Sequence, residues 1–79
     1  MLNEKQAMEW LKEGAVLDFT TWGNKYPIFI IDNHLKRCDK ISHKLLSKLK
    51  INKQLVLIEQ ETLSYTYKLK GVSANSSQH

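Results

Sequence analysis

One stretch decides the fold: Asp39-Lys40-Ile41-Ser42-His43-Lys44-Leu45-Leu46-Ser47-Lys48-Leu49-Lys50. Its apolar residues recur with the period of a helix, because on a wheel of 100° per residue they share one arc: Ile41, Leu45, Leu46 and Leu49. The opposite arc is polar and cationic: Lys40, His43, Lys44, Ser47, Lys48 and Lys50. We predict an amphipathic helix at 39–50 that Asp39 caps, with one face buried and the other basic.

The chain before this helix predicts another helix and a β-hairpin. Asn3 and Gln6 form a capping-box pattern ahead of a helix from Glu4 to Glu13. Two runs rich in β-branched and aromatic residues follow, at Val16 to Thr21 and Tyr26 to Ile31. Because a turn-forming Gly-Asn pair separates these runs, we predict that they pair as a hairpin.

The chain after the helix predicts a second hairpin. Residues 55–60 and 64–70 form two more strand patterns around a turn at 61–63, whereas residues 33–38 are a short polar segment. Residues 71–79 lack apolar anchors, and we expect a disordered tail. The prediction is one α+β domain at 1–70, of order α-β-β-α-β-β, with an antiparallel sheet of two hairpins packed against two helices. Its predicted core is Trp10, Leu11, Phe19, Ile28, Ile30, Leu45, Leu49, Leu57, Tyr67 and Leu69.

Positive charge is concentrated in one part of the chain. Residues 36–53 carry seven cations and one acid, so this stretch nets +6 in a protein that nets +4. The cations are Lys36, Arg37, Lys40, Lys44, Lys48, Lys50 and Lys53. A localised field of one sign indicates an acidic partner, which is either nucleic acid or an acidic protein surface.

Composition places the protein among small soluble domains. Cys38 is the only cysteine, which excludes an intrachain disulfide, and with no hydrophobic leader we expect a cytoplasmic protein. The longest apolar run, Tyr26 to Ile31, is too short to span a bilayer, so we expect no membrane association. A chain of 79 residues buries a smaller fraction of its surface than a large one does, and a homodimer or another partner would add stability.

Three segments carry a family resemblance: Lys12-Glu13-Gly14-Ala15-Val16, the helix pattern from Ile41 to Lys50, and Ser64-Tyr65-Thr66-Tyr67-Lys68-Leu69. Over roughly residues 6–70 the chain resembles small winged-helix-like proteins of bacteria and phages, one branch of which is described as the toxin of a toxin–antitoxin pair. The resemblance implies that helix 39–50 lies in a DNA groove and that the second hairpin is the wing. Its lysines would then meet phosphates, while His43 and Ser47 would reach base edges.

The expected function is non-catalytic binding of nucleic acid, DNA in the first place, through the basic face of helix 39–50. The expected contact residues are Lys36, Arg37, Lys40, His43, Lys44, Ser47, Lys48 and Lys50. The alternative is a phage-type inhibitor or adaptor that binds and occludes a host or defence protein, with Trp22 and Tyr26 as contact residues. A third interpretation is a lysine-rich face that only keeps the protein soluble.

An enzyme or a metal protein is not expected. His34, Cys38 and His43 are close in sequence, but their spacing matches no standard zinc motif. The three glycines are isolated and form no phosphate-binding loop. We therefore predict no catalytic residue, no metal and no cofactor.

Overall fold

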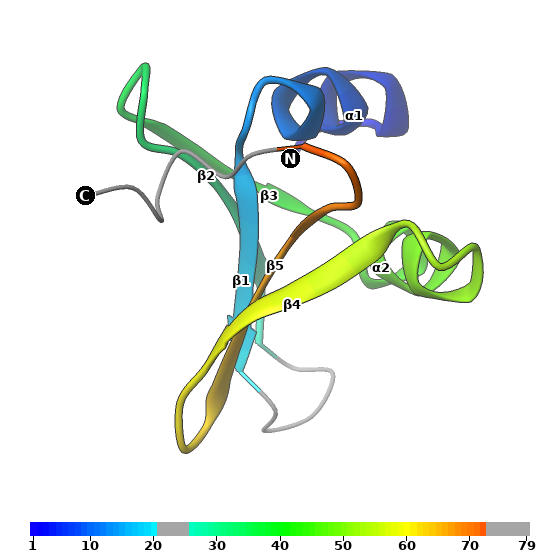
Figure 1. The fold of residues 1–79 in the computed structure, drawn as a ribbon. Helices are drawn as coiled ribbons and strands as arrows, with labels where there is room; N and C mark the ends of the chain where they lie inside the picture. The colour runs from blue at the N-terminus through cyan, green and yellow to red at the C-terminus, as the bar shows by residue number, and fades with distance from the viewer. Residues whose placement is uncertain (21–25, 73–79) are drawn as a thin grey trace.

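The computed structural model describes residues 1–20 and 26–72 (Figure 1). The elements are α1 (Glu4–Lys12), β1 (Val16–Thr20), β2 (Ile28–Asp32), β3 (Arg37–Ile41), α2 (His43–Ile51), β4 (Leu55–Gln60) and β5 (Ser64–Leu69). The predicted α+β class is confirmed. The predicted order lacked one strand, because the chain runs α-β-β-β-α-β-β.

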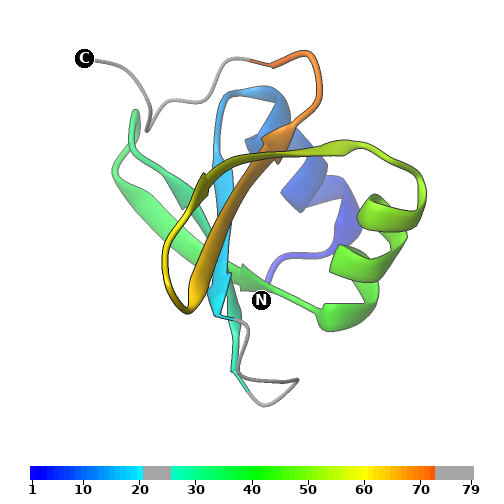
Figure 2. The ribbon, with the colours of Figure 1, turned by 60° about the horizontal axis from the view of Figure 1, so that its bottom comes forward.

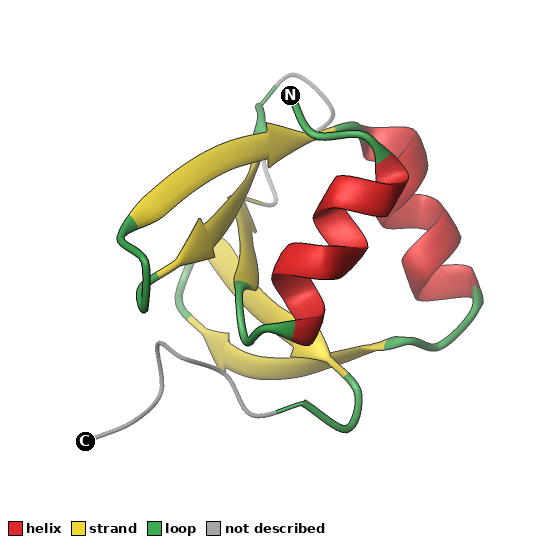
Figure 3. Cartoon of the chain, turned by 90° about the horizontal axis from the view of Figure 1, so that it is seen from above, coloured by secondary structure: helices red, strands yellow, loops and turns green. Residues whose placement is uncertain are grey.

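All five strands form one antiparallel sheet in the order β3-β2-β1-β5-β4. β1 lies at its centre, where Leu17 is opposite Ile30 of β2 on one side and Tyr67 of β5 on the other. The sheet is strongly curved, and both helices lie on the same side of it (Figures 2 and 3). The opposite side of the sheet is called the outer face below.

The core fills the space between the helices and the sheet. Leu17 and Ile30, which share the helix side of the sheet, are completely buried against residues of both helices. Burial of Leu11, Ile28, Ile30, Leu45, Leu49 and Leu69 confirms most of the predicted core. Trp10, Phe19 and Tyr67 are only partly buried against it. Leu57 was wrongly predicted, since it is 42% exposed on the edge strand β4.

Local hydrogen bonds explain why α1 begins where the sequence predicts. The Oδ1 of Asn3 accepts the N–H of Gln6 at 2.8 Å, and the Oε1 of Gln6 accepts the N–H of Asn3 at 3.1 Å. These two bonds confirm the predicted capping box. The helix ends at Lys12, and Gly14 follows with φ of 106°, a conformation that glycine adopts without steric cost.

β3 is the main correction to the predicted fold. Residues 37–41 were predicted as the end of a polar segment and the start of a helix, but they pair with β2. The cause is the preceding turn, where Asp32 Oδ1 accepts the backbone N–H groups of His34 at 3.0 Å and Leu35 at 3.4 Å. Such a turn stabilised by an aspartate side chain reverses the chain and brings the next residues beside β2.

The start of α2 is corrected for the same reason. Asp39 lies in β3 and does not cap a helix. Instead Ser42 is the N-cap, and its Oγ accepts the N–H of Leu45 at 3.1 Å. Ile41 is buried as predicted, although it belongs to the strand. The helix therefore covers His43–Ile51 and excludes Lys40.

The remaining predictions on the fold agree closely with the described residues. β4 has the predicted bounds, and β5 ends one residue earlier than predicted. The predicted Gly23-Asn24 turn and the tail from residue 73 onward lie outside the described residues. Neither described helix is long and apolar enough to cross a membrane.

Candidate nucleic-acid interface

The two sides of α2 differ in chemistry. Leu45, Leu46 and Leu49 are buried against the core. The opposite side is exposed, and its polar residues, here called the α2 basic face, are His43, Lys44, Ser47, Lys48 and Lys50. Ile51, the last residue of α2, is 78% exposed among them. The helix contains no acidic residue. The predicted amphipathic character of this segment is therefore confirmed from His43 to Lys50.

Two features shape the charge of the α2 basic face. Lys48 Nζ forms an ion pair with both carboxylate oxygens of Glu4, at 2.9 and 2.8 Å, and this pair links α2 to the start of α1. Lys44 lies in the first turn of α2, where the helix dipole is positive. Because a cation in a first turn is unfavourable for the helix itself, its presence there raises the local positive potential without stabilising α2.

The α2 basic face continues into a group of aromatic rings. Phe19 of β1 and Tyr65 and Tyr67 of β5, together called the aromatic cluster, lie on the helix side of the sheet. The ring centroids of Phe19 and Tyr67 are 5.6 Å apart with nearly parallel planes, and Phe19 and Tyr65 are 6.0 Å apart. Lys50 Nζ lies 5.8 Å from the centroid of Phe19 and 5.7 Å from that of Tyr67. All three rings are partly exposed.

Two acidic residues of the sheet, Asp18 and Glu59, lie on the outer face. Asp18 and Glu59 are both opposite Thr66, one from β1 and one from β4, and directly paired residues share a face of a sheet. The pKa of Asp18 is raised by burial and, to a smaller extent, by the negative charge of Glu61. The carboxylates of Asp18 and Glu59 therefore do not line the surface formed by the α2 basic face and the aromatic cluster.

Three predicted contact residues do not belong to α2. Lys36 lies in the β2–β3 turn with φ of 53°, and Arg37 and Lys40 are in β3. Lys40 is on the outer face, where its Nζ lies 6.0 Å from the ring centroid of Phe29. The single basic surface predicted from sequence is thus divided, because residues 36–41 form a turn and a strand.

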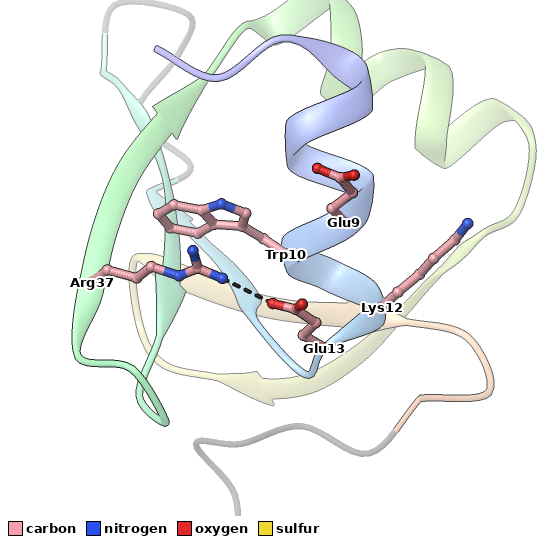
Figure 4. Close-up of a pocket in the computed structure, with 5 residues that line it drawn as sticks. All are labelled: Glu9, Trp10, Lys12, Glu13 and Arg37. Atoms are coloured by element: carbon pink, nitrogen blue, oxygen red, sulfur yellow. Dashed lines mark hydrogen bonds and ion pairs between the residues drawn. The ribbon is translucent and has the colours of Figure 1, made fainter.

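Arg37 is engaged in a structural cluster (Figure 4). Its guanidinium carbon lies 4.1 Å from the ring centroid of Trp10, and its Nη2 contacts Glu13 Oε1 at 2.9 Å. Its Nε donates to Asp32 Oδ2 at 3.0 Å, and Asp32 is only 1% exposed. A guanidinium that bridges two carboxylates and stacks on an aromatic ring links α1 to the sheet and is not available to bind phosphate.

Tyr26, which was proposed for protein contact, lies next to the aromatic cluster. It is 46% exposed, and it lines a shallow hollow with Pro27, Phe29 and Phe19 among others. Phe29 is itself 37% exposed on the outer face. Trp22 lies outside the described residues.

The histidines and the cysteine considered in the sequence belong to three different elements. His34 is in the β2–β3 turn, Cys38 is exposed on β3, and His43 begins α2. Within residues 1–20 and 26–72, no three histidine, cysteine, aspartate or glutamate side chains gather in a way that could hold a metal ion.

The aromatic cluster is the part of this surface that sequence reasoning missed as a unit. Phe19 and Tyr67 were predicted as core residues, and Tyr65 was given no role. The alternation of Tyr65 and Tyr67 in a strand was a usable signal, but their contact with Phe19 depends on the β1–β5 register. Comparison of the chain with protein-family models, with curated proteins and with solved structures found no match.

Proposed function

We propose that this protein is a non-catalytic nucleic-acid-binding protein and that the α2 basic face is its contact surface. The observation that carries the proposal is the exposed set of lysines, with His43 and Ser47, on a helix that contains no acid. Lysine side chains that displace counterions from phosphates supply the main free energy of such binding. Electrostatic attraction alone accounts for the contact, so no catalytic group is required.

Sequence specificity should be weak. The α2 basic face carries no arginine, asparagine or glutamine, the side chains best suited to bidentate contact with guanine or adenine. The one arginine of the chain is engaged with Asp32 and Glu13. We therefore propose that phosphate contacts give affinity, while His43 and Ser47 add at most a modest preference for particular bases.

The winged-helix resemblance adds a docking mode to this proposal. α2 would be the recognition helix, and the β4–β5 hairpin that follows it would be the wing. The element before α2 is strand β3, so the support comes from the helix and hairpin alone and not from a helix-turn-helix pair.

The test is fluorescence anisotropy of a labelled 20-base-pair duplex at two salt concentrations. The variant Lys44→Glu/Lys53→Glu, called the α2 variant, reverses one exposed lysine of the α2 basic face and one that follows the end of α2. Neither lysine forms an ion pair among the described residues. The control is Lys5→Glu/Lys12→Glu, which makes the same change of net charge on the exposed side of α1. If Lys44, Lys50 and Lys53 contact phosphates while Lys48 stays paired with Glu4, the plot of log K against log salt has a slope of about −2.7 for the wild type.

The two variants distinguish nucleic-acid binding through the α2 basic face from binding that depends only on net charge. The α2 variant should lower the magnitude of the slope by about 2 and weaken binding strongly, whereas the α1 variant should bind nearly as the wild type does. No binding by the wild type to duplex or single-stranded DNA at low salt, or equal losses in both variants, would contradict the proposal.

A protein partner is the second candidate function, and exposed aromatic rings favour it. Tyr26 and Phe29 lie together at the hollow described above, with Lys40 beside Phe29. An exposed aromatic group next to a cation is typical of residues that dominate protein interfaces. Loss of partner capture in Tyr26→Ala/Phe29→Ala, with capture retained in the α2 variant, would assign binding to this hollow.

A further inference from the structure

We propose that the aromatic cluster, together with Lys50, binds the bases of single-stranded nucleic acid. This inference rests on the proposed function and specifies the form of nucleic acid that the surface prefers. It adds a stacking contact to the phosphate contacts of the α2 basic face.

The first argument is the position of the rings. Leu17 and Leu69 are buried at one end of β1 and β5, but Phe19, Tyr65 and Tyr67 remain partly exposed toward the other end. Tyr65 is not among the residues that pack against the core, whereas Phe19 and Tyr67 are. Neighbouring aromatic rings on two adjacent strands form a surface on which unpaired bases can stack.

The second argument is charge complementarity at the same place. A nucleotide that stacks on the rings brings its phosphate close to them, and that phosphate needs a cation. Lys50 Nζ lies within 6 Å of two ring centroids and belongs to the α2 basic face, so one residue joins the stacking surface to the phosphate-binding surface. The nearby carboxylates of Asp18 and Glu59 are on the outer face and do not oppose this contact.

These two features together favour a single strand over a duplex. The bases of a duplex are stacked on each other and cannot reach a protein ring without unpairing, whereas those of a single strand are available. Lysines bind the backbone of either form. The aromatic cluster is therefore the element that should distinguish them.

The test compares two fluorescein-labelled probes, (dT)20 and a 20-base-pair duplex, by anisotropy at low salt. Tyr65→Leu keeps an apolar side chain but removes the ring, and Tyr65→Phe keeps the ring. Tyr65→Phe is therefore the matched control, because it changes the same residue without removing the stacking surface. Circular dichroism and urea unfolding of each variant establish that it is folded under the assay conditions.

We expect Tyr65→Leu to weaken binding of (dT)20 by about tenfold or more, with duplex binding changed less than about twofold. Tyr65→Phe should bind both probes as the wild type does. Equal effects of Tyr65→Leu on the two probes, or no effect on either, would overturn the inference. If Lys44→Glu/Lys53→Glu still abolishes binding in that case, the proposed function stands and only the stacking contact is refuted.

Discussion

The buried carboxylate of Asp32 should contribute more to stability than any other acid whose contacts are described here. It accepts two backbone N–H groups of the β2–β3 turn through Oδ1 and the Nε of Arg37 through Oδ2. Asp32→Asn preserves Oδ1 but places an amide N–H₂ against the Arg37 donor. Because a hydrogen bond to a charged group contributes about 1.5–3 kcal/mol, we expect the free energy of unfolding to fall by about 2 kcal/mol.

This loss is large for a domain of this size, whose total stability should be about 4–12 kcal/mol. Urea unfolding at pH 7, followed by far-UV circular dichroism, should show a midpoint lower by about 2 M if the slope is near 1 kcal/mol per M. Glu59→Gln is the control, since it makes the same carboxylate-to-amide change on an exposed strand position and should cost less than about 0.5 kcal/mol.

A double-mutant cycle that combines Asp32→Asn with Arg37→Met then tests whether the loss of unfolding free energy comes from the ion pair between these two residues. Arg37→Met removes the guanidinium but keeps an apolar side chain beside Trp10. We expect a coupling free energy of about 1 kcal/mol or more between the two changes, because their groups are in direct contact. A midpoint for Asp32→Asn equal to that of Glu59→Gln, or a coupling near zero, would refute the stabilising role given to the ion pair between Asp32 and Arg37.

Three further predictions concern local electrostatics and capping. The pKa of Asp18 is raised above its ordinary value of 3.8 by burial and, to a smaller extent, by Glu61. Asp18→Asn should therefore stabilise the protein near neutral pH and raise the urea midpoint. This gain should vanish below pH 3.8, where the wild-type carboxyl is protonated. The pKa of Asp39 is lowered by the backbone N–H of the next residue and then by the N-terminal amine. Asp39→Asn should therefore lower the urea midpoint above pH 3.8. The difference in midpoint from the wild type should be lost as the pH falls through the folded-state pKa of Asp39. Ser42→Ala removes the α2 cap and should cost about 1 kcal/mol, whereas Ser47→Ala on the exposed side should not destabilise; equal midpoints for these two variants would contradict the capping role.

The helices could be predicted because their signals are local. Capping and apolar period identify α1 and most of α2 without knowledge of the rest of the chain. β3 could not be predicted as readily, because its pairing depends on how Asp32 bonds to the turn after β2. The alternating burial of Arg37, Asp39 and Ile41 is consistent with a strand, but that pattern is short and mostly polar.

The same distinction applies to the candidate site. The α2 basic face was predictable, since residues opposite a buried helix face are exposed in any fold that buries the apolar side. The role of Arg37 was not, because Trp10, Glu13 and Asp32 reach it from distant parts of the sequence. The aromatic cluster likewise depends on the register of β1 with β5.

The distribution of charge over the two sides of the sheet bears on how a polyanion would approach. Lys44 and Lys50 project from α2 on the helix side, whereas Asp18 and Glu59 lie on the outer face near the β4–β5 turn. A local group of cations such as the α2 basic face orients a small protein in the field of a charged partner before contact, and at low salt it raises the association rate. Because the aromatic cluster lies beside Lys50, an encounter through this face also brings the rings toward the nucleic acid. The proposed phosphate contacts and the proposed base contacts therefore require only one orientation of the protein.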